Sequence, residues 1–218
     1  MLEKLIEIQK KMASKVVLRD IYKLDEIEYV LGVDQAFVGD LVLSACVKLS
    51  FPELEFVESE IGVSKVEMPY IPTFLMFREG KPAVNVVKKL VKKNERSVVL
   101  VDGSGIAHPR RCGLATYIGL KLEIPSIGIT KKKLYGRVEE PRKTLESSPI
   151  YDDGEIIGFA LKTCRNCRPI YISPGHLIST GSSLEVVKLC LRKRKLPEPI
   201  RLAHEVVTNK KSTLYPRV

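Results

Sequence analysis

Two aspartates follow short apolar runs, and their placement indicates the chemistry of the chain. Asp34 comes directly after Tyr-Val-Leu-Gly-Val, and Asp102 comes directly after Ser-Val-Val-Leu-Val. Short β-branched runs that end at loop residues are typical of buried strands, and neighbouring strands would bring both carboxylates to one edge of a sheet. A third acid, Glu79, lies between them in the sequence Phe-Arg-Glu-Gly. Carboxylate oxygens are ligands for hard divalent cations, so the pattern favours a Mg²⁺ site.

A structural role is the alternative, because an aspartate after a strand often caps the next helix or turn. For either aspartate alone this alternative is as good as metal binding. For the pair it is weaker, because Gly103 and Gly105 follow Asp102 and leave space where a ligand could approach the backbone. Three carboxylates close together would also repel one another without a cation.

The charge of the chain favours a polyanionic partner. The formal net charge is +10 and the sequence pI is near 9.3. Lysine and arginine gain free energy by displacing counterions from phosphates, although a solvated lysine face would give the same composition. Basic runs at Arg110-Arg111, Lys131–Lys133 and Arg192–Lys195 lie near expected strand ends or loops. They indicate a track for phosphates.

Length and hydropathy suit one domain. A chain of 218 residues with 44% hydrophobic residues can form one large core, and we expect a single α/β domain over residues 1–218. No apolar run approaches the roughly 20 residues of a membrane span, and the first residues lack the pattern of a signal peptide. We therefore expect a cytoplasmic protein with no membrane partner.

The five cysteines are an odd number in a chain without a secretory signal, which favours a reducing compartment. Cys164 and Cys167 form a CxxC pair, but His176 is the only further ligand nearby, and a tetrahedral zinc site needs four. Two unpaired thiols are preferred here, with a local disulfide as the alternative. The other cysteines are expected to be structural: Cys46, Cys112 and Cys190.

The elements that must position the acids follow a mixed α/β order. A first strand is expected to end at residue 34. Further strands are expected over residues 41–49, 54–61, 97–102, 127–129, 155–162 and 169–173. Expected helices span 1 to about 15, 83–91 after Gly80-Lys81-Pro82, 111 to about 122, and about 182–192. Residues 136–155 have the composition of a loop.

This order predicts a ribonuclease-H-like fold, a mixed five-stranded sheet flanked by helices. Three meandering strands are followed by a helix, a strand, a helix and a strand, and acids end the first and fourth strands. In such sheets these two strands lie side by side. Asp34 and Asp102 would then share a divalent metal that activates a water and polarises a phosphoryl group.

Six motifs, in this order and spacing, resemble the endonuclease V family over about residues 25 to 207. They are Gly32–Phe37, Pro69–Pro72 leading to Phe77-Arg78-Glu79, Val101–Arg110, Gly128–Lys131, Ser173–His176 and Leu196–His204. The resemblance implies a DNA repair endonuclease that recognises deoxyinosine and hydrolyses the second phosphodiester bond 3′ to it with Mg²⁺. Mn²⁺ is expected to substitute for Mg²⁺.

The resemblance also assigns roles by position. Asp34, Asp102 and Glu79 correspond to metal ligands, Lys131 to a cation near the scissile phosphate, and His204 to the residue that orients the attacking water. Pro69, Tyr70, Ile71 and Pro72 correspond to a wedge that fills the base stack. The expected lesion pocket is Leu75, Gly103, His108, Gly113, Leu114 and Leu134. Expected nucleic-acid contacts are Arg110, Arg111, Lys132, Ser173, Gly175 and His176.

Three positions depart from the family pattern. Thr73 stands where the family often has glycine, and Ser104 stands where it often has histidine or glutamine. Tyr117 replaces a frequent histidine. These changes leave the acids untouched but bear on the pocket and on strictness for hypoxanthine.

Other classes of protein explain less of the sequence. A non-catalytic nucleic-acid module does not explain three acids beside basic runs, since carboxylates repel phosphate without a metal. An actin-like ATPase or sugar kinase would need a second similar domain. A structure-specific nuclease of the same fold and an inosine-specific ribonuclease are the remaining alternatives. The expected partner is double- or single-stranded DNA with deoxyinosine, or inosine-containing RNA, bound by a monomer.

Overall fold

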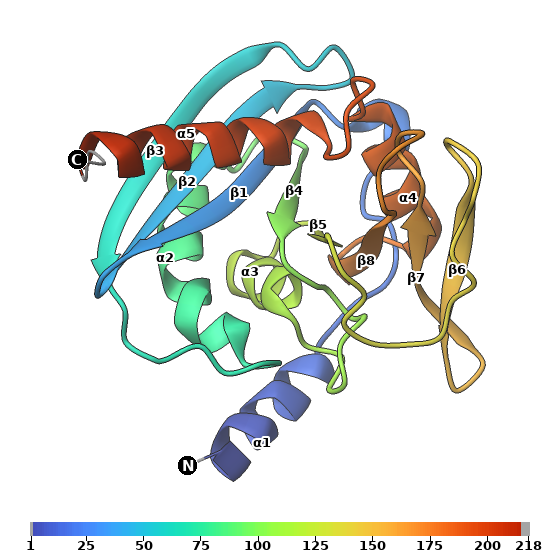
Figure 1. Cartoon of the computed structure of the whole chain (residues 1–218), viewed down its shortest axis with the longest axis horizontal. Coiled ribbons are helices and arrows are strands. Elements are labelled where there is room, and N and C mark those ends of the chain that lie inside the picture. The colour runs from blue at the N-terminus through green and yellow to red at the C-terminus, as the bar shows by residue number, and fades with distance from the viewer. Residues whose placement is uncertain (1, 215–218) are drawn as a thin grey trace.

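A computed structural model describes residues 2–214 as one eight-stranded sheet with helices on both faces (Figure 1). The strands are β1 Tyr29–Val38, β2 Leu41–Ser50, β3 Phe56–Lys65, β4 Ser97–Asp102, β5 Ser126–Thr130, β6 Ser147–Asp152, β7 Glu155–Leu161 and β8 Ile170–His176. The helices are α1 Leu2–Ala13, α2 Leu75–Leu90, α3 Leu114–Leu122, α4 Thr180–Leu189 and α5 Glu198–Leu214, with a 3₁₀ turn η1 at Leu24–Glu26.

The strand order, β3-β2-β1-β4-β5-β8-β7-β6, confirms the ribonuclease-H-like fold and corrects the size of its sheet. β1 is antiparallel to β2 and parallel to β4, and Val33 lies opposite Val101. The residues that follow, Asp34 and Asp102, therefore reach the same edge. The prediction of five strands was wrong because β8 pairs with the free side of β5, and β7 and β6 extend the sheet further.

Alternating side chains along the central strands build two cores. Val30, Val98 and Leu100 face a core that includes residues of α4 and α5. Leu31, Val33, Val99 and Val101 face the opposite core, with α2 and α3. Figure 1 shows α5 crossing one face of β1 and β2, with α2 and α3 behind the sheet. Period-two alternation of buried residues is what two covered faces require.

Several element boundaries differ from those expected. β1 continues through Asp34 to Val38, and β3 begins at Phe56. α2 begins at Leu75, so Glu79 lies on this helix and Pro82 lies inside it. β6 lies within the expected loop 136–155, and α5 had not been predicted.

β8 continues to His176 through Ser-Pro-Gly, a sequence that usually marks a turn. Its glycine has a packing reason instead. A Cβ at Gly175 would lie 2.3 Å from Ser126 Oγ and 2.8 Å from the Ala115 backbone, so α3 can approach this strand only if a side chain is absent.

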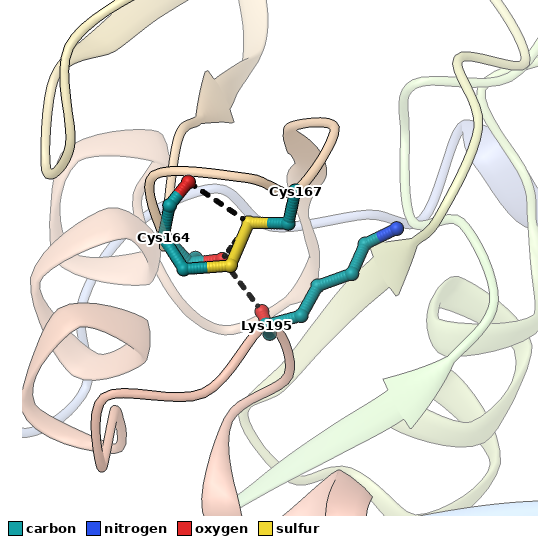
Figure 2. Close-up of a disulfide and its surroundings, with 4 residues drawn as sticks. Cys164, Cys167 and Lys195 are labelled. Atoms are coloured by element: carbon teal, nitrogen blue, oxygen red, sulfur yellow. Dashed lines mark hydrogen bonds between the residues drawn. A yellow bond between two sulfur atoms is a disulfide. The ribbon is translucent and has the colours of Figure 1, made fainter.

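The cysteines divide as the sequence suggested, with one correction. Cys46, Cys112 and Cys190 are buried free thiols. Cys164 and Cys167 form a disulfide that closes the loop between β7 and β8, so the preference for unpaired thiols was wrong (Figure 2). Among residues 2–214, no helix is both long and apolar enough to cross a membrane.

Candidate active site and base pocket

Asp34 is the most buried acid at the edge shared by β1 and β4, with a relative exposure of 6%. Its Oδ2 accepts a hydrogen bond from His204 Nδ1 at 2.7 Å, and its Oδ1 accepts from the backbone N–H of Gln35 at 2.8 Å. Burial and the charge of Asp102 nevertheless raise the pKa of Asp34 above its usual value. The hydrogen bonds from His204 and Gln35 therefore do not fully offset the free-energy cost of burying the charged Asp34 carboxylate beside Asp102.

Lys131 follows β5 and lies beside Asp102. Because β5 is parallel to β4, the residues after both strands share one edge, and Lys131 Nζ donates to Asp102 Oδ2 at 2.6 Å. Burial disfavours the charged lysine, but the charge and the hydrogen bond of Asp102 outweigh it and raise the pKa of Lys131. This lysine therefore stays protonated beside Asp102.

Glu79 reaches the same acids from α2 and is 8% exposed. Burial raises its pKa to about 8, Arg78 opposes the shift, and the charges of Asp34 and Asp102 add to it. Within residues 2–214, no three acid, histidine or cysteine side chains already enclose a metal position. The chemistry of the donors still fits a divalent cation, because a bound cation would stabilise three carboxylates that now repel one another.

His204 is held by the seating of α5 on β1. A Cβ at Gly32 would lie 2.0 Å from the carbonyl oxygen of Pro199, so the first turn of α5 lies directly on the strand backbone. Arg201 forms ion pairs with Glu198 and Glu205 along the exposed side of the same helix. The His204 side chain is 55% exposed, against 9% for Asp34, and its second ring nitrogen can reach solvent.

A cavity of about 530 Å³ opens next to Asp102 and Lys131. All six residues expected for the lesion pocket line it: Leu75, Gly103, His108, Gly113, Leu114 and Leu134. Thr73 and Ser104, two of the positions that depart from the family pattern, also line it. The structure adds lining residues that the sequence had not indicated: Gln9, Met76 and Cys112. Gln9 lies on α1, a helix that the spacing of its apolar residues predicted. That spacing indicates which face of the helix packs against the domain, but it does not indicate a role for Gln9 itself.

The backbone at Thr73 is the most heavily bonded point of the pocket rim. Its carbonyl oxygen accepts from Gln9 Nε2 at 3.0 Å, His108 Nε2 at 2.9 Å and Arg110 Nη2 at 2.8 Å. Arg110 Nη2 also donates to Thr73 Oγ1, and Arg110 Nε donates to Gln9 Oε1. Thr73 has a φ of +68°, a left-handed conformation that glycine adopts more easily than threonine. We call these four residues the hinge cluster.

His108 is a neutral wall of the pocket. Burial lowers its pKa to about 4, and its Nδ1 accepts from the backbone N–H of Arg110. Arg110 also stacks on Phe74, with its guanidinium carbon 4.4 Å from the ring centroid. Both residues are therefore engaged within the protein, and Arg110 supports the rim more directly than it offers a phosphate contact.

The expected wedge projects from the surface ahead of the hinge cluster. Tyr70 is 64% exposed, and Pro69 and Pro72 on either side are exposed as well. Tyr70 also borders the cavity. The prolines restrict the conformations of this segment, so it would lose less entropy when it orders against a partner.

The expected nucleic-acid contacts divide into exposed and buried residues. Lys132 is exposed beside Lys131, whereas Arg111 forms ion pairs with Asp152 and Glu155.

Three of the expected contacts are corrected, because Ser173, Gly175 and His176 are buried in β8. Ser173 Oγ accepts from the N–H of Gly105, and His176 Nδ1 accepts from the N–H of Val17. They support the loop after Asp102 and the entry to the sheet.

A ribonuclease-H-like sheet that brings acids, a lysine and a histidine to one edge, next to a cavity that can hold a base, places this chain among the nucleases. The family model for endonuclease V matches residues 10–205, and the chain belongs to that family. It is therefore an endonuclease, a hydrolase that acts on DNA, in a family of metal-dependent nucleases.

Relatives match the chain along nearly its whole length. An endonuclease V from Archaeoglobus fulgidus is 57% identical over 215 residues, which cover 99% of this chain and 96% of the relative. The endonuclease V structure from Bacillus subtilis aligns with a TM-score of 0.90 at 26% identity, covering 98% of this chain and 93% of the other.

A third relative was solved with nucleic acid. A variant of Ciona intestinalis endonuclease V, in complex with a 23mer DNA containing an inosine followed by a ribo-adenosine, aligns with a TM-score of 0.86 at 25% identity. The alignment covers 98% of each chain.

Proposed function

We propose that this protein is a DNA repair endonuclease that recognises deoxyinosine and hydrolyses the second phosphodiester bond on its 3′ side with Mg²⁺, for which Mn²⁺ can substitute. We call Asp34, Glu79 and Asp102 the acid cluster. One observation carries the proposal: the cavity that would hold the base is bordered by Asp102 of this cluster and by Lys131, which donates to Asp102. Recognition of a base and attack on a nearby phosphate can then occur in one complex.

The acid cluster would hold the metal through Asp34, Asp102 and Glu79. When bound, the metal supplies Lewis-acid activation of water and neutralises charge on the phosphate. Lys131, a compact protonated cation already directed at Asp102, would stabilise negative charge on the leaving oxygen. His204 donates from Nδ1 to Asp34, which in the neutral ring leaves Nε2 as an acceptor for a proton of the attacking water.

The wedge and the cavity would cooperate in reading the lesion. Rotating a base out of a duplex costs a few kcal/mol, and an inserted aromatic ring offsets part of that cost. Tyr70 is exposed at the cavity edge, where its ring could replace the missing base. The inosine-containing DNA bound by the Ciona relative supports this substrate.

The test is cleavage of an end-labelled duplex with one deoxyinosine, beside an unmodified duplex and an inosine-containing RNA, with Mg²⁺, with Mn²⁺ and with EDTA. We expect a metal-dependent nick one nucleotide beyond the inosine on its 3′ side, and none in the unmodified duplex. Equal cutting of both DNA duplexes would favour a structure-specific nuclease. Cutting of the RNA alone would favour an inosine-specific ribonuclease.

A further inference from the structure

A second hollow, of about 1030 Å³, lies between residues 139–148 and the loop 162–169. It is separate from the base pocket and shares no lining residue with it. Five cations line it: Arg142, Lys143, Lys162, Arg165 and Arg168. All but the half-buried Lys162 are exposed. We call this region the basic hollow.

The cations of the basic hollow are available to an external anion. Within residues 2–214, none of the five takes part in an ion pair. Two acids of the hollow are already engaged: Glu146 accepts from the backbone N–H groups of Arg142 and Lys143, and Glu140 accepts from the hydroxyl of Tyr171. Two of the three acids that line the hollow thus have partners within the protein, and the third, Glu139, is exposed. The five cations therefore still outnumber the acids of the hollow.

The walls of the hollow are fixed before any ligand binds. The N–H of Leu145 donates to the carbonyl of Lys162 at 2.7 Å, and the N–H of Lys162 donates to the carbonyl of Glu146 at 3.0 Å. The disulfide Cys164–Cys167 closes the turn that carries Arg165, and Arg168 follows directly (Figure 2). Preorganised cations lose less conformational entropy when they bind a phosphate chain.

The basic hollow is also hydrogen-bonded to the segment that leads into α5, the helix that carries His204. Thr163 Oγ1 donates to the carbonyl of Lys195 at 2.8 Å, and Figure 2 shows Lys195 next to the disulfide. Lys195 ends the basic run 192–195, and α5 with His204 begins at Glu198. Arg192 donates to backbone carbonyls of Pro52 and Glu53, which leaves Lys193 and Arg194 as the exposed cations of that run.

We propose that the basic hollow, continued by Lys193–Lys195, binds the sugar-phosphate backbone of the duplex arm that flanks the cleavage site. The cations are spread over three chain segments, which suits a row of phosphates better than one small anion. The proposal rests on the proposed function in one respect only, that the substrate is duplex DNA running past α5. It assigns a binding role to the β6–β8 extension, which supplies no residue of the acid cluster.

The test compares Arg165→Gln/Arg168→Gln with the matched control Lys88→Gln/Lys93→Gln. These two lysines are exposed, Lys88 in the last turn of α2 and Lys93 in the loop that follows the helix. Affinity is measured against salt concentration on a long inosine duplex and on one trimmed to a few base pairs on each side. For the long duplex we expect the slope of log K against log salt to fall by about 2 in the arginine variant. We expect no change in the control, or for either variant on the trimmed duplex.

An unchanged slope for the arginine variant on the long duplex would overturn the proposal, and so would an equal fall on both duplexes. Matching melting temperatures for the two variants would exclude a folding defect. The same slopes are measured on an unmodified long duplex. If the wild-type protein failed to cut inosine while the slope difference persisted, the proposed lesion specificity would fail and the binding surface would stand.

Discussion

The acid cluster, through Asp102, and the hinge cluster border the same cavity, and they differ in how well the protein satisfies their polar groups. At the hinge cluster, one carbonyl oxygen of Thr73 receives three side-chain donors, and the neutral His108 uses both ring nitrogens. At the acid cluster, Glu79 and Asp34 have raised pKa values because burial and mutual repulsion disfavour their charges. We therefore expect recognition of the base to rely on preorganised contacts, and catalysis to depend on a cation bound at the acid cluster.

The largest effect is expected from removing a charge of the acid cluster. Asp102→Asn or Asp34→Asn should reduce cleavage by about a thousand-fold or more, because metal stabilisation of the transition state amounts to several kcal/mol. Binding of inosine duplex should change little, since metal ligands act mainly on the transition state. Single-turnover cleavage and equilibrium binding measure the two separately. Retained cleavage in either variant would remove these residues from the metal site.

Glu79 gives a stability test of the same cluster. Its pKa is about 8 in the folded chain against an ordinary 4.5, so the folded state holds a proton that the unfolded chain releases. Without metal, the stability present below pH 4.5 is therefore lost progressively as pH rises to about 8. Glu79→Gln should remove that loss, with a gain on the order of a few kcal/mol at the alkaline end.

Thermal unfolding in EDTA across this pH range provides the measurement, with the wild-type protein in Mg²⁺ as the control. If the melting temperatures of the wild type and of Glu79→Gln changed with pH in the same way, the burial of Glu79 near the two aspartates would not destabilise the fold.

The wedge provides the next smaller effect. Tyr70→Ala should weaken binding to an inosine duplex by about 1–3 kcal/mol, the range for loss of one aromatic stacking contact. Binding to single-stranded inosine DNA should fall less, because fewer stacking contacts have to be replaced. Phe56→Ala, at an exposed aromatic residue of β3 that lines neither the cavity nor the basic hollow, is the control. Equal losses on the two substrates would contradict a wedge.

The smallest effect is expected at the hinge cluster. Gln9→Ala removes two donors, to Thr73 O and Cys112 O, and one acceptor for Arg110. Because hydrogen bonds contribute about 1 kcal/mol each, preference for inosine over unmodified duplex should fall several-fold. Cleavage at saturating substrate should be preserved. Lys10→Ala, at the adjacent exposed position, should leave both unchanged, and a loss of cleavage rate with intact preference would assign Gln9 to catalysis instead.

Sequence alone predicted the central strands β1 and β4 better than the start of α2 or the edge strand β6. Asp34 and Asp102 could be placed because two β-branched runs have few structural alternatives, and the parallel pairing of β1 with β4 confirms that placement. Pro82 concealed the start of α2, because a proline is expected to begin a helix, yet this one lies inside. Nothing in the polar sequence around β6 distinguished an edge strand from a loop.

In the candidate site too, contacts between segments that are distant in the sequence could not be predicted from local patterns. Local patterns identified the two aspartates and the glycines after Asp102, and the wedge was predicted only from the family resemblance. The four-residue hinge cluster joins segments more than 60 positions apart through Gln9, which no local pattern indicates. Ser173 and His176 are polar residues in a turn-like sequence, which favoured surface contacts until β8 was seen to be buried. Polar residues that satisfy buried backbone groups cannot be distinguished by local sequence from those that bind ligands.

The contact between His204 and Asp34 joins residues 170 positions apart. During synthesis the chain emerges from its N-terminus, so the first acid is present long before α5 can dock over Gly32. A nascent chain that has not yet delivered α5 holds the acids without their histidine. We therefore expect the proposed water-orienting contact of His204 to form only after the segment that carries α5 has been synthesised.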